Sequence, residues 1–216
     1  MAGSSTGPDA KALRIGVFGG AFDPPHRAHR LLAEAAIRDL ALDRLLILPT
    51  GEAWHKSRPL SLATHRVAMC QMAFGDLHRV LVDEREIRRA TPSFTVDTLN
   101  ELSREHPAAR FFLFIGEDQF RAFRTWRDWQ SILSLATLVV AARPDSQGMS
   151  QLSREAVGDE PKIPHERLVM PLLPVSSTEI REVAASGSTG APRLSELVPP
   201  AVASYISTHS LYQQPS

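Results

Sequence analysis

The chain has 216 residues, a formal net charge of zero and 43% hydrophobic residues. That length suits one well-buried α/β domain and is short for two separate cores. The even charge balance, without basic runs, disfavours broad binding to nucleic acid or to a membrane surface. The single cysteine, Cys70, excludes an internal disulfide and fits a reducing cytoplasm.

The N-terminal residues 1–12 contain several glycines, serines and alanines, which is typical of a flexible tail. They lack the apolar centre of a signal peptide, and no apolar run in the chain approaches membrane-spanning length. We therefore expect a soluble, cytoplasmic protein in which the tail precedes one domain over residues 13–213.

The first apolar run, Leu13–Phe18, is short and bounded by glycines, as in a buried strand of a parallel sheet. Gly19 and Gly20 then permit a sharp turn, and from about His26 the apolar spacing becomes helical. His26 and His29 therefore share the first turn of a helix, at the end that attracts anions. The sequence predicts a phosphate site at this turn.

Simpler interpretations of the same residues exist. Two glycines after a strand are common, and His26 and His29 are compatible with surface side chains or with half of a metal site. No third ligand lies nearby at a spacing typical of zinc, so no metal site is predicted. The segment matches neither the dinucleotide-binding G-x-G-x-x-G pattern nor the Walker pattern. The combination of glycines, prolines and paired histidines favours the phosphate interpretation.

Further strands and helices alternate along the chain. Apolar runs predict five more strands, over Arg44–Leu48, Arg79–Val82, Arg110–Ile115, Thr137–Ala142 and Leu168–Met170. Helical spacing covers Thr64–Phe74 and the segment from Ser93, its expected N-cap, to about His106. This alternation predicts a doubly wound, Rossmann-like parallel sheet with helices on both faces, with ligands at the carboxyl edge of the strands. Residues 145–166 lack a pattern and are expected to form a loop.

Three side chains near strand ends are candidates for ligand contacts, and two tryptophans follow on a helix. Lys56 and Arg143 lie on loops that leave predicted strands, where a cation reaches a phosphate or simply faces solvent. Asp118 follows the most apolar strand, and either bonds a ribose hydroxyl or stabilises a helix N-terminus. Trp126 and Trp129 lie three apart on one expected helical face, and we place Trp129 in the core.

A second polar motif, Val175–Arg181, opens a late helix. Ser176 and Glu179 fit the capping-box pattern, which by itself explains both residues. The hydroxyls of Ser177 and Thr178, with Arg181 one turn later, also suit a polyphosphate.

Both motifs resemble those of one enzyme family. Residues 19–29, Gly-Gly-Ala-Phe-Asp-Pro-Pro-His-x-x-His, are similar to the opening motif of the [T/H]-x-G-H nucleotidyltransferases, and most similar to nicotinate-nucleotide adenylyltransferases. Residues 175–181 resemble the family's Ile-Ser-Ser-Thr-x-Ile-Arg motif, and the likeness extends from about Arg14 to Tyr212. Five residues depart from the family pattern: Ala28 replaces a glycine, Glu117 an alanine, Trp54 a proline, Phe94 a tyrosine and Val175 an isoleucine.

The resemblance implies adenylyl transfer from ATP to nicotinate mononucleotide, which forms deamido-NAD and pyrophosphate, with Mg²⁺ carried mainly by the ATP phosphates. It implies catalytic roles for His26, His29 and Arg181. The implied ATP contacts are Gly19, Gly20, Ala21, Phe22, Gly116, Asp118, Ser177, Thr178 and Arg181. The implied acceptor contacts are Lys56, the main chain of Phe94 and Thr95, and the Trp126 ring, with Arg143 as a further candidate.

Two other functions fit the same motifs. A sibling transferase would use nicotinamide mononucleotide or phosphopantetheine as the acceptor. A catalytically silent nucleotide-binding protein is the alternative that Ala28 and Glu117 suggest, since both change the surroundings expected of the nucleotide. Release of pyrophosphate with each acceptor separates these functions.

Overall fold

The computed structural model describes residues 12–51, 59–142, 163–171 and 173–213. The strands are β1 (Arg14–Gly20), β2 (Arg44–Pro49), β3 (Val80–Val82), β4 (Arg110–Gly116), β5 (Ala136–Ala142) and β6 (Glu166–Val169). The α-helices are α1 (Arg27–Asp39), α2 (Ala63–Phe74), α3 (Arg85–Arg88), α4 (Thr95–Glu105), α5 (Glu117–Arg121), α6 (Trp129–Leu135), α7 (Ser177–Ala185), α8 (Ala191–Leu197) and α9 (Pro200–Thr208). Two 3₁₀ turns are η1 (Phe123–Thr125) and η2 (Gly187–Thr189).

The six strands form one parallel sheet in the order β3-β2-β1-β4-β5-β6. The chain moves outward from β1 to β3, then returns to the centre at β4 and moves outward on the other side. The doubly wound fold and the central place of β4 are therefore confirmed. A switch point of this kind opens a crevice beyond the carboxyl ends of the two central strands, β1 and β4.

Alternate residues of each strand face two separate hydrophobic cores. Phe112 and Phe114 of β4 belong to the core shared with α1, α2 and α9, while Phe111, Leu113 and Ile115 face α4 and α6. Burial of each such side chain stabilises the fold by about 1.5–3 kcal/mol. A slip of one residue would exchange the two faces, so this pattern fixes the register of the strand.

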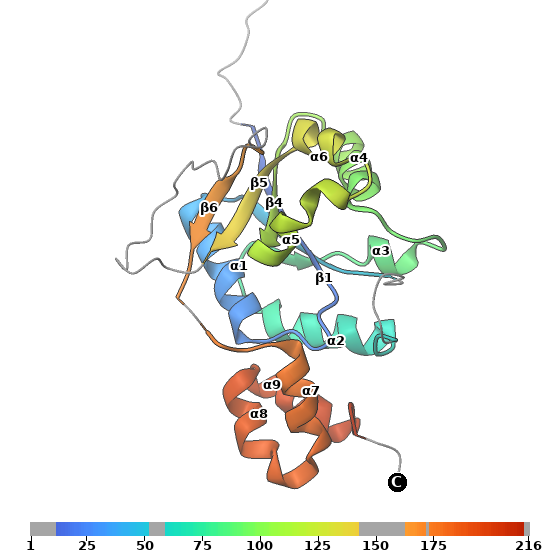
Figure 1. Ribbon diagram of the computed structural model, residues 1–216, viewed down its shortest axis with the longest axis vertical. Helices are drawn as coiled ribbons and strands as arrows, with labels where there is room; N and C mark the ends of the chain where they lie inside the picture. The colour runs from blue at the N-terminus through green and yellow to red at the C-terminus, as the bar shows by residue number, and fades with distance from the viewer. Residues whose placement is uncertain (1–11, 52–58, 143–162, 172, 214–216) are drawn as a thin grey trace, which may run out of the picture.

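Helices α7, α8 and α9 gather at one end of the molecule, beyond α1 and α2 (Figure 1). Val198, Val202 and Ile206 are buried there in the same core as the apolar face of α1. This packing brings the C-terminal segment close to the turn between β1 and α1, although the two are far apart in the sequence.

Three sequence predictions differ from the structure. The N-cap of α4 is Phe94 and not Ser93, whose hydroxyl instead donates to the Glu86 carbonyl at 3.4 Å. Trp126 and Trp129 do not share a helical face, because Asp128 between them is left-handed, with φ of 49°, and interrupts the helix. The last strand begins at Glu166 rather than Leu168.

The other predicted strands and the helices starting near residues 26, 64 and 177 are found within about three residues of the expected bounds. Within the described part of the chain, no helix is long and apolar enough to cross a membrane. Most of the predicted loop over residues 145–166 lies outside the described residues.

Candidate active site

The turn between β1 and α1 is anchored by an aromatic side chain. Phe22 is buried at a positive φ of 45°, and its ring packs edge-on against Phe18, His29 and Phe74. The Phe22 side chain is therefore part of the core, which leaves only its main chain to face a nucleotide. At Gly19 an added Cβ would meet nothing within 4 Å, so the end of β1 is open to a ligand.

His26 and His29 stack on each other at the start of α1, with ring centroids 3.6 Å apart. The His26 amide donates to His29 Nδ1 at 3.2 Å. Because Nδ1 accepts this bond, the proton of a neutral His29 ring is on Nε2, where it can be donated to a ligand. Burial lowers the pKa of His26 to about 4, so this ring is neutral at pH 7. His26 Nδ1 has no hydrogen-bond partner among the described residues.

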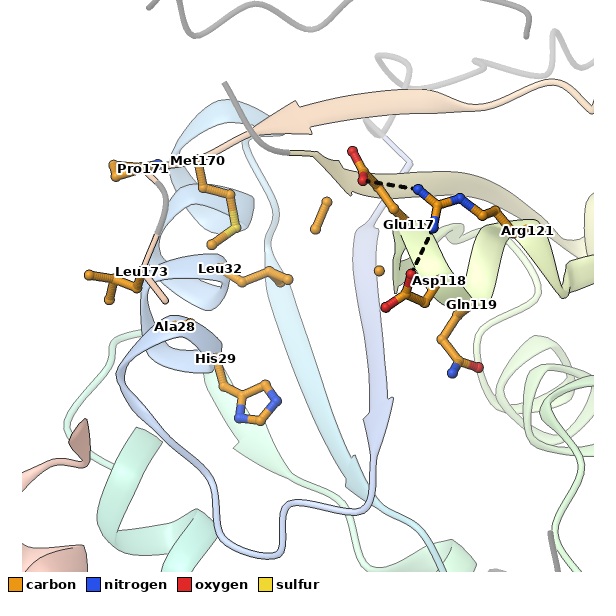
Figure 2. Close-up of a pocket in the computed structure, with 12 residues that line it drawn as sticks. Ala28, His29, Leu32, Glu117, Asp118, Gln119, Arg121, Met170, Pro171 and Leu173 are labelled. Atoms are coloured by element: carbon orange, nitrogen blue, oxygen red, sulfur yellow. Dashed lines mark hydrogen bonds and ion pairs between the residues drawn. The ribbon is translucent and has the colours of Figure 1, made fainter. Parts of the chain in front are cut away.

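A pocket of roughly 530 Å³ opens beside His29, between α1 and α5. We call it the α1–α5 pocket. Figure 2 shows His29 projecting into the space that faces α5. The lining residues are Ala28, His29, Leu32, Gly116, Glu117, Asp118, Gln119, Arg121, Ala141, Met170, Pro171 and Leu173. The pocket therefore lies at the carboxyl ends of β4 and β5, beside the switch point, as the topology requires.

The charged wall of this pocket belongs to α5. Arg121 is within 3.0 Å of Asp118 and 3.8 Å of Glu117, and Figure 2 shows it reaching both carboxylates. The Asp118 side chain is 92% exposed, which leaves its carboxylate accessible to a ligand. The negative charge of Glu117 is thus balanced locally by Arg121, for which the sequence pattern gives no signal.

The second polar motif meets the first at the turn before α1. Ser177 Oγ donates to the Pro24 carbonyl at 3.0 Å, and Arg181 Nη1 donates to the Asp23 carbonyl at 2.9 Å. Arg181 Nη2 also donates to Thr178 Oγ1 at 2.9 Å. The two motifs, about 150 residues apart in the sequence, therefore adjoin the same turn, although this second group does not line the α1–α5 pocket.

Ser176 caps α7, as predicted, by accepting a bond from the Glu179 amide at 3.1 Å. The Glu179 carboxylate is directed elsewhere and pairs with Arg193 at 3.0 Å. The cap positions the first turn of α7 against the Asp23–Pro24 segment.

A buried charged network packs against the turn between β1 and α1. Asp23 is 1% exposed, and its carboxylate accepts bonds from the Tyr212 hydroxyl at 2.9 Å and from the Ser61 amide at 3.2 Å. Arg66, also buried, donates to the carbonyls of Ala21, Thr50 and Ser61. Burial lowers the pKa of Arg66, and the nearby Asp23 carboxylate partly opposes that shift. Periodicity gave no signal for Arg66 because it occupies an ordinary helical position.

The predicted acceptor residues lie at the start of α4 and beside η1. Phe94 and Thr95 are half-buried at the N-terminus of α4, and Trp126, also half-buried, follows η1 with its ring 5.4 Å from Phe123. The Arg127 guanidinium lies 4.7 Å from the centre of the Phe94 ring and connects the two segments. Lys56 and Arg143 lie outside the described residues.

The buried carboxylate of Glu86 joins the start of α4 to the end of β2. Glu86 accepts bonds from Thr98 Oγ1 at 2.8 Å and Thr50 Oγ1 at 3.3 Å, and burial raises its pKa. It therefore holds α4 against the loop that follows β2. Neither Glu86 nor Arg127 was identified from the sequence, since each depends on a contact between distant segments.

Comparisons with known proteins agree with this geometry. Residues 17–183 match the family model described as cytidylyltransferase-like, which defines the class of the fold and its site. A probable nicotinate-nucleotide adenylyltransferase of Albidiferax ferrireducens is 50% identical over 93% of this chain and 98% of its own. One of Methylibium petroleiphilum is 42% identical over 94% and 93%. The chain belongs to the nicotinate-nucleotide adenylyltransferase family.

Solved structures show the same fold. The Plasmodium falciparum nicotinic acid mononucleotide adenylyltransferase complexed with NaAD aligns with a TM-score of 0.70 and 17% identity, over 93% of this chain and 97% of that one. A putative nicotinate-nucleotide adenylyltransferase of Vibrio parahaemolyticus aligns with a TM-score of 0.66 and 19% identity. At these identities the similarity concerns the fold.

Proposed function

We propose that this chain transfers the adenylyl group of ATP to nicotinate mononucleotide, which forms deamido-NAD and pyrophosphate. The observation that carries the proposal is the meeting of the His26–His29 pair and the α7 motif at one turn, beside the α1–α5 pocket. Family membership supports the same reaction.

The reaction needs positioning more than it needs a base. A phosphate monoester has a second pKa of about 6, so the phosphate of the mononucleotide is already anionic at neutral pH. One of its oxygens attacks the α-phosphorus of ATP, and the bond from that phosphorus to the bridging oxygen of the leaving pyrophosphate breaks. His29 Nε2–H and the His26 ring are proposed to donate to the α-phosphate as negative charge develops there.

The adenosine and the pyrophosphate of ATP are assigned to different sides of the α-phosphate. We place the adenosine in the α1–α5 pocket, where the exposed Asp118 carboxylate suits a ribose hydroxyl and Gly116 allows close approach. The pyrophosphate is assigned to the first turn of α7, with Ser177, Thr178 and Arg181 as donors. The main chain of residues 19–22 closes the remaining side.

Mg²⁺ enters as part of the ATP substrate in this proposal. Among the described residues, no group of three or more histidine, cysteine or acidic side chains is placed to hold a metal ion. The Asp23 carboxylate is already bonded to Tyr212 and Ser61. The phosphates, with water, would therefore supply most of the ligands that Mg²⁺ prefers.

The acceptor is assigned to α4 and the segment after η1. The amides of Phe94 and Thr95 suit the carboxylate of the pyridine, and the Trp126 indole offers a flat surface for its ring. Lys56 and Arg143 are proposed contacts of the mononucleotide on the sequence alone. We infer that both substrates are small molecules, with no nucleic acid or membrane partner, and that the reaction occurs in the cytoplasm.

The test is pyrophosphate release measured with ATP and each of three acceptors, namely nicotinate mononucleotide, nicotinamide mononucleotide and phosphopantetheine. We expect the highest kcat/KM with nicotinate mononucleotide and no release with phosphopantetheine. Preference for another acceptor would replace this function with that of a sibling transferase. Binding of ATP without release of pyrophosphate with any acceptor would indicate a silent nucleotide-binding protein.

A further inference from the structure

The Asp23–Pro24 segment is held from three directions. Its two carbonyls accept bonds from Arg181 and Ser177 of the α7 motif. The Asp23 carboxylate accepts one bond from the Ser61 amide, on the loop before α2, and another from Tyr212 near the C-terminus. The segment is thus the point at which the β1 turn, the α2 region and the C-terminal helices meet.

The bond from Tyr212 is a strong one. The distance from its hydroxyl to Asp23 Oδ1 is 2.9 Å, and the carboxylate is almost completely buried. Burial first, and the Asp23 carboxylate second, raise the pKa of the Tyr212 phenol, so the hydroxyl remains a donor at all physiological pH values. A hydrogen bond to a charged, buried acceptor is among the costliest to remove, because water cannot replace the lost donor.

We propose that Tyr212 is a positioning residue of the adenylyl-transfer site. Its hydroxyl fixes the Asp23–Pro24 segment, and this segment in turn positions the His26–His29 pair and Arg181. His26, the N-cap of α1, comes three residues after Asp23, and Arg181 bonds directly to the Asp23 carbonyl. A displacement of Asp23 therefore moves both groups that the proposed function places on the α- and leaving phosphates. This inference rests on that function.

Tyr212 does not line the α1–α5 pocket and is not assigned to the acceptor. Its loss should therefore disturb the alignment of reacting groups more than the binding of either substrate. In Tyr212→Phe, which removes only the hydroxyl, we expect kcat to fall on the order of 10- to 100-fold, the scale of a small misplacement of catalytic groups. The KM for nicotinate mononucleotide, which is assigned to α4, should remain close to that of the wild type, and the KM for ATP should rise by a smaller factor than that by which kcat falls.

Tyr205→Phe is a matched control. Tyr205 and Tyr212 are the two tyrosines of the chain. The Tyr205 hydroxyl is 3.0 Å from His65 Nδ1 and joins α9 to α2, whereas the Tyr212 hydroxyl bonds to Asp23. Tyr205→Phe deletes a phenol hydrogen bond in the same C-terminal region but leaves the Tyr212 bond to Asp23 in place. Its kcat should therefore equal that of the wild type. An equal fall in both variants would overturn the proposal, as would an unchanged kcat in Tyr212→Phe.

Two further measurements complete the test. If Tyr212→Phe does not fold, Tyr212→Phe/Asp23→Asn removes the buried negative charge that has lost the phenol donor, and a wild-type kcat in that folded double variant would overturn the proposal. Hydrogen exchange over residues 19–27 should be faster in Tyr212→Phe than in Tyr205→Phe, and equal exchange would also overturn it. Exchange needs no turnover, so an inactive wild type would count against the proposed function alone.

Discussion

Three features of the site meet at His29, which lines the α1–α5 pocket, stacks on His26 and, when neutral, carries its proton on Nε2. We predict that His29→Ala lowers kcat by roughly 10²–10³-fold, the effect of removing one transition-state donor. Pyrophosphate release under saturating substrates measures the loss. His78→Ala, at an exposed position, serves as the control and should retain full activity.

The fold of His29→Ala should remain intact, because the core beneath it is formed by Phe18, Phe22 and Phe74. Circular dichroism and the melting temperature check this expectation. Near-normal turnover in a folded His29→Ala protein would contradict a catalytic role for this residue.

His26 should make stability depend on pH. Its folded-state pKa of about 4 lies below the unfolded value of about 6.5, so the unfolded chain binds more protons between these two values. The free energy of unfolding should therefore fall as the pH drops from about 6.5 to 4, by up to roughly 3 kcal/mol, and this contribution should be constant above 6.5.

Urea unfolding at several pH values measures this dependence, and His26→Gln isolates it from the titration of the carboxylates. The variant should lose less stability than the wild type over that window. His78→Gln, at an exposed site, should follow the wild-type curve. Parallel curves for wild type and His26→Gln would show that burial does not keep the ring neutral.

Arg127 should influence the choice of acceptor. Its guanidinium lies over the Phe94 ring, beside the α4 amides that are assigned to the pyridine carboxylate. The side chain is 56% exposed, so its attraction for that carboxylate is screened and modest. We predict that Arg127→Met lowers the ratio of kcat/KM for nicotinate over nicotinamide mononucleotide by about two- to fivefold. Arg124→Met, which alters an arginine over Trp129, should leave the ratio unchanged.

At the scale of elements, the sequence predicts most of the framework. The strands were located because β4 and its neighbours are continuous apolar runs, which parallel sheets buried on both faces require. Short helices such as α3 and α5 were missed, since four or five residues are too few to show a period. The break at Asp128 was also missed, because a left-handed residue that is not glycine leaves little trace in the sequence.

The capping of α7 gives a prediction about an element. Ser176 accepts from the Glu179 amide, and α7 carries the donors assigned to pyrophosphate. Ser176→Ala should lower the free energy of unfolding by about 1 kcal/mol, the usual cost of losing a serine cap. Urea unfolding measures the change, and Ser207→Ala, at an exposed position inside α9, should have little effect. Equal stability of Ser176→Ala and the wild type would mean that tertiary contacts alone hold the first turn of α7.

At the scale of the whole molecule, the site is a product of topology. The sequence places the expected ligands at the carboxyl edge of the sheet, and the structure brings both polar motifs to one turn. It does not indicate Arg66, Glu86 or Tyr212, because their roles depend on which distant segments meet. A buried ion or phenol in an ordinary helical or terminal position has no local pattern from which its partner can be inferred.

The meeting of the two polar motifs at one turn predicts how nucleotides stabilise the fold. ATP at about 100 times its Kd should stabilise by about 2.7 kcal/mol, which raises the Tm of a chain of this size by about 5–10 °C. AMP lacks the phosphates assigned to α7, so Arg181→Met should reduce the ATP shift by more than it reduces the AMP shift. Loss of the Arg181 bond to Asp23 disturbs the turn equally for both nucleotides, so the difference between their shifts isolates the polyphosphate contact. Scanning calorimetry measures both shifts, and an equal loss with ATP and AMP would remove Arg181 from the pyrophosphate site.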